Sequence, residues 1–147
     1  MMEFSIHPYE GASPITFEMT AAAVEALLGP PDVVRLNELG ERDELRGKIS
    51  VRYSSVDNKV VEIAFVPGVA VSLHGCSLFE AQDLVDFLLN LDPYPLEFVG
   101  FLIFLRLGIT VTGFHDQDEA QKAITVFREG RWDEFRREAQ VFKKRKE

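Results

Sequence analysis

The sequence predicts a single domain, residues 1–147, of the α+β class: a mainly antiparallel sheet of about six strands in two meanders, covered by two or three helices. Apolar and polar residues alternate with period two in three runs of residues 48–73, with turn residues between the runs. A second set of three apolar runs lies between residues 98 and 128. Segments with helical spacing or helix-capping residues precede, separate and follow the two sets.

The N-terminal third contains one predicted helix between two weaker segments. Alternation predicts a short strand at Ile15–Phe17. A helix is expected over Ala21–Leu28, because Thr20 can cap it and a Gly-Pro-Pro sequence follows it. Residues 32–47 are charged and weakly patterned, which predicts a surface loop that includes a short strand at Val33–Leu36.

The meander of residues 48–73 has one apolar and one polar face. The apolar positions predicted to be buried are Ile49, Val51, Tyr53, Val61, Ile63, Phe65, Val69, Val71 and Leu73. Side chains of the opposite face, Ser50, Arg52, Ser54 and Glu62, are expected to be exposed. Because the apolar positions build the core, we expect function to lie on this polar face or in the loops.

The second half begins with a capping box, Ser77 followed by Glu80, which predicts a helix with an apolar stripe through Leu88. Phe98–Leu105 is apolar on both faces and predicts a central buried strand. The alternation of Leu107–Thr112 predicts a further strand.

The last elements are less uniform in pattern. Lys122–Arg128 fits a strand or a helix, and its β-branched residues favour a strand. A final helix is expected over Trp132–Lys144, and residues 140–147 are expected to form a frayed basic C-terminal tail.

Charge and cysteine content narrow the class of protein. Residues 128–147 contain eight Lys/Arg and five Asp/Glu, whereas the other 127 residues contain eight and nineteen. Such an acidic body disfavours nucleic acid and favours a basic protein partner. A single cysteine, no secretory signal and no apolar run of membrane-spanning length predict a cytoplasmic protein.

Two short segments carry candidate chemistry. His74 and Cys76 precede a predicted helix and could form a nucleophile pair, but no third residue that would orient the histidine is apparent. The segment His115–Glu119 is rich in oxygen ligands, but it lacks the Gly and Glu that a calcium-binding EF-hand loop requires, which favours a solvated loop. We therefore expect no catalytic residues, no metal and no cofactor.

The N-terminal block Ile6-His7-Pro8-Tyr9-Glu10-Gly11 is followed by Ile15-Thr16-Phe17-Glu18-Met19-Thr20, Val24 and Leu28-Gly29-Pro30-Pro31. Val51, Tyr53, Val61-Glu62-Ile63, Phe65, Gly75 and Leu107-Gly108-Ile109 continue the pattern. It resembles a family of small bacterial cytoplasmic proteins, some of which are similar to immunity proteins encoded beside interbacterial toxins. The resemblance implies a binding role, carried by no particular residue because the matching positions are structural.

The leading hypothesis is an immunity protein that neutralises a basic toxin or effector by occlusion. The residues expected to contact this partner are Glu38, Glu41, Asp43, Glu44, His115, Asp116, Asp118 and Glu119. One alternative is a small enzyme or ligand-binding domain with a pocket near His74 and Cys76. The other is a structural subunit that homo-oligomerises through a sheet edge.

Overall fold

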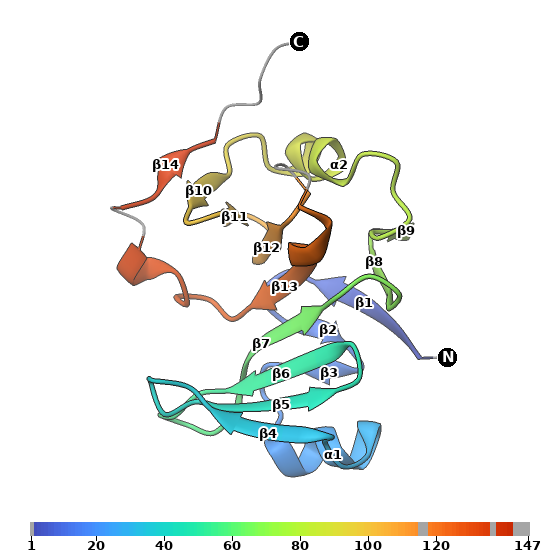
Figure 1. Cartoon of the computed structure of the whole chain (residues 1–147), viewed down its shortest axis with the longest axis vertical. Helices are drawn as coiled ribbons and strands as arrows, with labels where there is room; N and C mark the ends of the chain where they lie inside the picture. Colours follow the sequence, from blue (N-terminus) through green and yellow to red (C-terminus); the bar gives the residue numbers. More distant parts are fainter. Residues whose placement is uncertain (1, 115–117, 136–137, 143–147) are drawn as a thin grey trace.

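The computed structural model describes residues 2–114, 118–135 and 138–142, and its fold is α+β (Figure 1). Two helices, α1 (Ala21–Leu28) and α2 (Leu84–Leu91), accompany two sheets. The larger sheet has nine strands in the order β14 (Gln140–Val141), β10 (Leu96–Phe98), β11 (Phe101–Phe104), β12 (Ile109–Thr112), β13 (Ala123–Phe127), β7 (Val60–Phe65), β6 (Ile49–Tyr53), β5 (Arg42–Arg46) and β4 (Val33–Leu36). The smaller has five, in the order β3 (Ile15–Thr16), β2 (Gly11–Ser13), β1 (Glu3–His7), β8 (Ala70–Leu73) and β9 (Cys76–Ser77).

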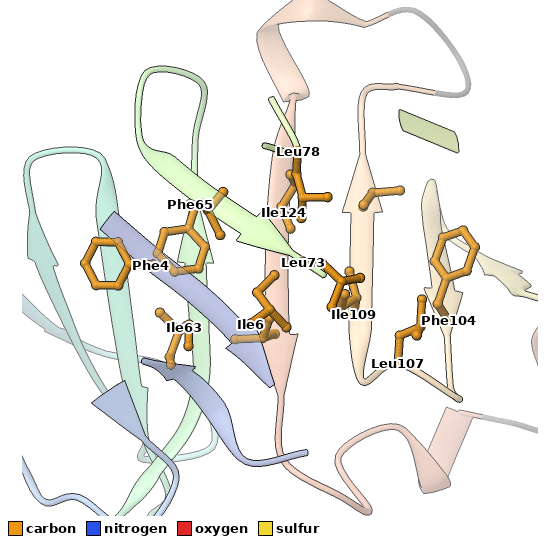
Figure 2. Close-up of a cluster of buried hydrophobic side chains, with 14 of the residues drawn as sticks. Phe4, Ile6, Ile63, Phe65, Leu73, Leu78, Phe104, Leu107, Ile109 and Ile124 are labelled. Atoms are coloured by element: carbon orange, nitrogen blue, oxygen red, sulfur yellow. The ribbon is translucent and has the colours of Figure 1, made fainter. Parts of the chain in front are cut away.

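The larger sheet consists of two antiparallel meanders, β4–β7 and β10–β13, joined where β13 pairs with β7. Two meanders were expected, but the structure has more strands than the predicted six, and they form two sheets. The smaller sheet packs against one face of the larger. Figure 2 shows Phe4 and Ile6 of β1 lying close to Ile63 and Phe65 of β7.

The third run of the predicted meander belongs to the other sheet. Its alternation is as expected, since Val71 and Leu73 are buried. However, β8 pairs in parallel with β1, with Phe4 opposite Val71, and does not pair with β7. The reason is that β7 already has β6 on one side and β13 on the other, so no edge of β7 is open to a third partner.

The segment predicted as a surface loop, residues 32–47, contains β4 as expected and also the five-residue strand β5. Charged side chains concealed the strand pattern in the sequence. Within the sheet these charges are compensated, since Asp43 lies opposite Arg52 of β6 and Arg42 pairs with Glu44 of the same strand.

The predicted capping box does not form. Ser77 lies in β9 and pairs with Ser72, so it cannot cap a helix. Helix α2 begins after Asp83, whose carboxylate accepts a hydrogen bond from the Asp86 amide at 3.0 Å. By contrast, α1 has the bounds that the sequence predicts, and the amide of Gly29 bonds to the carbonyl of Glu25 at its end.

The apolar segment 98–105 is a hairpin rather than one central strand. It holds the end of β10, a turn at Val99 and Gly100, and β11, with Phe98 opposite Phe101. Residues 122–128 contain the strand β13, as propensity favoured. The final helix is not formed in the described residues, which contain a 3-10 turn at Asp133–Phe135 and the strand β14. There the aromatic rings pack on the sheet, and β14 pairs with β10.

The turn between β10 and β11 is strained. Val99 has a φ of 48° and is 81% exposed. A β-branched residue in the left-handed region costs about 1–2 kcal/mol. We expect Val99→Asn to raise the free energy of unfolding by roughly 0.5–1 kcal/mol, measured by urea denaturation. Val56→Asn, at a valine that is 91% exposed and has no positive φ, should change it little. Equal effects of the two substitutions would contradict the strain.

Candidate functional site

A cavity of about 820 Å³ lies on the polar face of the larger sheet. Its floor includes Arg52, Glu62 and Thr125, which lie on neighbouring strands β6, β7 and β13. Residues 128–135 follow β13 and form one wall, and the turns after β4 and after β6 form the opposite wall. The volume falls in the range of natural ligand sites. As the alternation of the sequence predicts, Arg52, Ser54 and Glu62 lie on this face, but they are not exposed as expected, since Ser54 is buried and Arg52 and Glu62 are half-buried.

A continuous series of ion pairs runs along the polar face of the sheet and into the cavity, which Arg52, Glu62, Arg131 and Glu41 line. Arg52 is central, because its guanidinium lies 3.7 Å from Asp43 and 3.1 Å from Glu62. Ser50 adds a hydrogen bond of 2.5 Å to Asp43. In spatial order the series is Arg35, Asp43, Arg52, Glu62, Arg131 and Glu41. Alternating charges at these distances keep each carboxylate next to a cation, so the floor is polar but internally neutralised.

Arg131 joins the C-terminal segment to the sheet. Its Nη2 donates to Glu41 at 2.9 Å, Nη1 donates to the other oxygen of that carboxylate, and Nε donates to Glu62 at 3.0 Å. Burial would lower the pKa of Arg131, but the hydrogen bond to Glu41 and the charge of Glu62 outweigh it and raise the pKa. Burial would raise the pKa of Glu41, but hydrogen bonds from Arg131 and Asn37 hold it below its ordinary value. Both groups therefore remain charged at neutral pH.

An aromatic cluster forms the side of the cavity near β10 and β11. The ring of Trp132 lies 5.5 Å from that of Phe101 and 5.6 Å from that of Phe135, and Phe135 lies 5.4 Å from Phe98. These ring contacts hold residues 128–135 against the sheet through apolar packing, while Arg131 holds the same residues through ion pairs.

Glu44 belongs to the opposite, core-facing side of β5. It is 2% exposed, accepts a hydrogen bond from the Tyr53 hydroxyl at 3.2 Å and lies 3.0 Å from the guanidinium of Arg46. Burial and the neighbouring Glu44 carboxylate raise the pKa of Tyr53, so its hydroxyl stays protonated.

The predicted contact residues occupy different environments. Glu41, Asp43 and Glu44 are buried and paired with arginines, whereas Glu38 and Asp118 are exposed. The backbone of Glu119 begins a 3-10 turn. His115 and Asp116 lie outside the described residues. The structure thus gives three of these carboxylates partners within the chain, and contact with another protein stays a prediction.

His74 and Cys76 do not line this cavity. His74 is an exposed turn residue with a φ of 52°, and Cys76 is half-buried in β9 with its Sγ 3.9 Å from the carbonyl of Ser77. Within the described part of the chain, no three His, Cys, Asp or Glu side chains gather as metal ligands would. No helix among these residues has the length and apolar character needed to cross a membrane.

Arg131 and Trp132 are the site residues that sequence reasoning missed. It placed Trp132 at the start of a helix and assigned Arg131 to no element. The charges of residues 41–46 and the Arg52–Glu62 pair are a usable signal for cross-strand pairing. Nothing local indicates that a residue ninety positions later completes the pairing of Glu41.

No family model matches the chain, and neither the curated proteins nor the solved structures include a significant match.

Proposed function

We propose that this chain is a protein-binding module that acts by occlusion, most specifically an immunity protein that neutralises a basic toxin. One observation carries the proposal: exposed apolar side chains surround the mouth of a cavity whose floor is ion-paired. Leu39 is 69% exposed, Val56 91% and Phe135 40%, and all three line the cavity. Large apolar side chains that are exposed together on one face are typical of protein interaction sites.

The charge of the chain supports a basic partner. Its formal net charge is −8, and the acidic excess belongs to the body of the chain rather than to its last twenty residues. Such a field accelerates the approach of a basic protein and repels acidic competitors. Apolar contacts at Leu39, Val56 and Phe135 would then supply most of the affinity.

The ion pairs in the cavity fix its shape before a partner binds. Arg131 holds the carboxylate of Glu41 ionised, and Glu62 holds the other side of the same guanidinium. Groups locked in this way keep the cavity in one form before a partner arrives, which reduces the entropy lost on binding.

The test is co-expression with the toxin gene adjacent to the gene for this chain, followed by titration calorimetry of the purified pair. We expect rescue from toxicity and a complex that Val56→Ser weakens roughly three- to tenfold, because an exposed apolar contact is lost. Val66→Ser, at a valine that is 39% exposed and does not line the cavity, should change affinity less than about twofold. Neither rescue nor complex would refute the proposal.

A further inference from the structure

The strand β4 ends the larger sheet, and no described strand pairs with its outer side. The hydrogen bonds between β4 and β5 show which residues of β4 point their backbone N–H and C=O groups toward β5 and which point them outward. The amide of Asn37 bonds to the carbonyl of Glu41 at 3.0 Å, and β4 and β5 keep one register from there to Val33. Because bonded and non-bonded pairs alternate in antiparallel strands, the N–H and C=O groups of Val34 and Leu36 point outward. The edge therefore presents two complete sets of backbone donors and acceptors.

The side chains of β4 are unusually apolar for an edge. Val33 is 47% exposed, Val34 44% and Leu36 73%. Edge strands are normally protected by charges, prolines or a covering element. The single charged residue of β4, Arg35, lies 3.6 Å from Asp43 and is partly neutralised by it. In Figure 1 the β4 arrow lies at the open margin of the sheet beside α1.

We propose that β4 accepts an extended basic segment of a partner protein as a tenth, antiparallel strand of the sheet. The choice of a protein partner rests on the proposed function. Charge complementarity selects a basic segment, because exposed carboxylates flank the strand at both ends, Asp32 before it and Glu38 after it. Both carboxylates lie just beyond the extended residues of β4, Asp32 in a bend and Glu38 in a turn, so a lysine beyond each end of the paired segment would approach them. Pairing of this kind supplies affinity through the backbone and selectivity through the side chains.

A second copy of the chain fits the same edge poorly. Self-pairing must place outward-pointing residues opposite each other, which leaves three registers about a two-fold axis. With the two-fold axis at Arg35, the Arg35 residues of the two copies face each other, and Asp32 of each copy comes near Glu38 of the other. With the axis at Val34, Leu36 lies beside the bend that carries Asp32 of the second copy, and with the axis at Leu36, Val34 lies beside the turn that carries Glu38 of the second copy. Every register joins like charges or places an apolar side chain beside a segment that carries a carboxylate, which costs stability.

The probe is the synthetic peptide Lys-Thr-Val-Thr-Val-Thr-Lys, whose valines would lie opposite Val34 and Leu36. We expect saturable binding to the full chain, with slower hydrogen exchange and shifted NMR signals at the amides of Val34 and Leu36. The same peptide with Glu at both ends should bind roughly three- to tenfold more weakly, because two attractive end pairs become repulsive.

A proline variant tests the backbone contact directly. Val34→Pro removes an outward N–H that the β4–β5 pairing does not use, so the fold should persist while peptide affinity falls at least roughly tenfold. Val34→Thr keeps the N–H and the β-branch and should stay within about twofold. N-methylation of both valines in the peptide removes the same contacts with the protein unaltered, and it should also abolish binding.

Several results would overturn the proposal. One is the absence of saturable peptide binding. Another is binding that neither Val34→Pro nor N-methylation of the peptide changes. A third is a chain that is already dimeric without peptide and whose Val34 and Leu36 amides are protected from exchange. If Val34→Pro abolishes peptide binding but toxin neutralisation fails in the unaltered chain, the edge contact stands and the proposed function falls. Normal toxin binding by Val34→Pro would leave the proposed function intact and refute the edge contact.

Discussion

Arg131→Ala should be among the most destabilising substitutions on the surface of this protein. It removes a guanidinium that hydrogen-bonds two carboxylates, Glu41 and Glu62, whose side chains are 7% and 15% exposed. Removing one member of a buried ion pair leaves a charge without compensation, at a cost of about 3–5 kcal/mol. Because these groups are partly hydrated, we expect a loss of roughly 2–4 kcal/mol in the free energy of unfolding, measured by urea denaturation at pH 7.

Arg128→Ala is the matched control, three residues earlier on the same segment. Its guanidinium pairs with Asp57 at 2.9 Å, but the two side chains are 30% and 39% exposed. An exposed pair of this kind contributes about 0–1 kcal/mol. If Arg131→Ala costs no more than Arg128→Ala, the floor of the cavity does not depend on its ion pairs.

The effect should depend on pH in a defined direction. In the unaltered chain the pKa of Glu41 is lowered, so its contribution is complete above the unfolded value of about 4.3 and declines as pH falls through the folded value. In Arg131→Ala the guanidinium is lost and burial favours the protonated acid. The difference in stability between the two proteins should therefore be larger at pH 7 than at pH 4. A difference that grows on acidification would contradict this account.

Phe65→Ala should destabilise the fold by about 3–5 kcal/mol, as expected for removal of a fully buried phenyl ring. Phe65 has no exposed surface and lies on β7, which pairs with both β6 and β13. Its ring is 5.2 Å from that of Phe4, which belongs to the smaller sheet (Figure 2). The ring thus contacts both sheets, and its loss leaves a cavity between them. Calorimetric unfolding or a urea titration would measure the change.

Phe135→Ala is the comparison, because this phenylalanine is 40% exposed and lies over the cavity wall. It should cost no more than about 1–1.5 kcal/mol. If Phe65→Ala does not fold, Phe65→Leu provides the measurement, with an expected loss of about 1–2 kcal/mol. A loss at Phe65 no greater than at Phe135 would show that the contact between the sheets is weak.

The parts of the fold that the sequence predicts are those with local signals. Helix α1 has a stop at Gly29, and the strands β6, β7 and β12 alternate over several residues. The polar face of the sheet follows from the same alternation, and it carries the cavity. These features depend on propensity and period, which a short window of residues contains.

The errors concern both strand pairing and element type. The strand β8 has the predicted pattern, but its partner is β1, and no local feature distinguishes a parallel partner in another sheet from an antiparallel neighbour. The segment after residue 131 has helical spacing, yet Trp132 and Phe135 contact sheet residues, and tertiary packing outweighs helix propensity. The charges of residues 41–46 looked like a loop, because the arginines that pair with Asp43 and Glu41 lie on other elements.

The parallel pairing of Phe4 with Val71 has a consequence for synthesis on the ribosome. The N-terminal strand leaves the exit tunnel early, but one of its two neighbours is translated only after α1 and the β4–β7 meander. Until then, the edge of β1 that pairs with β8 has no native partner. The nascent chain therefore passes through a stage at which chaperones and proteases can bind it, and early translation pauses would lengthen that stage.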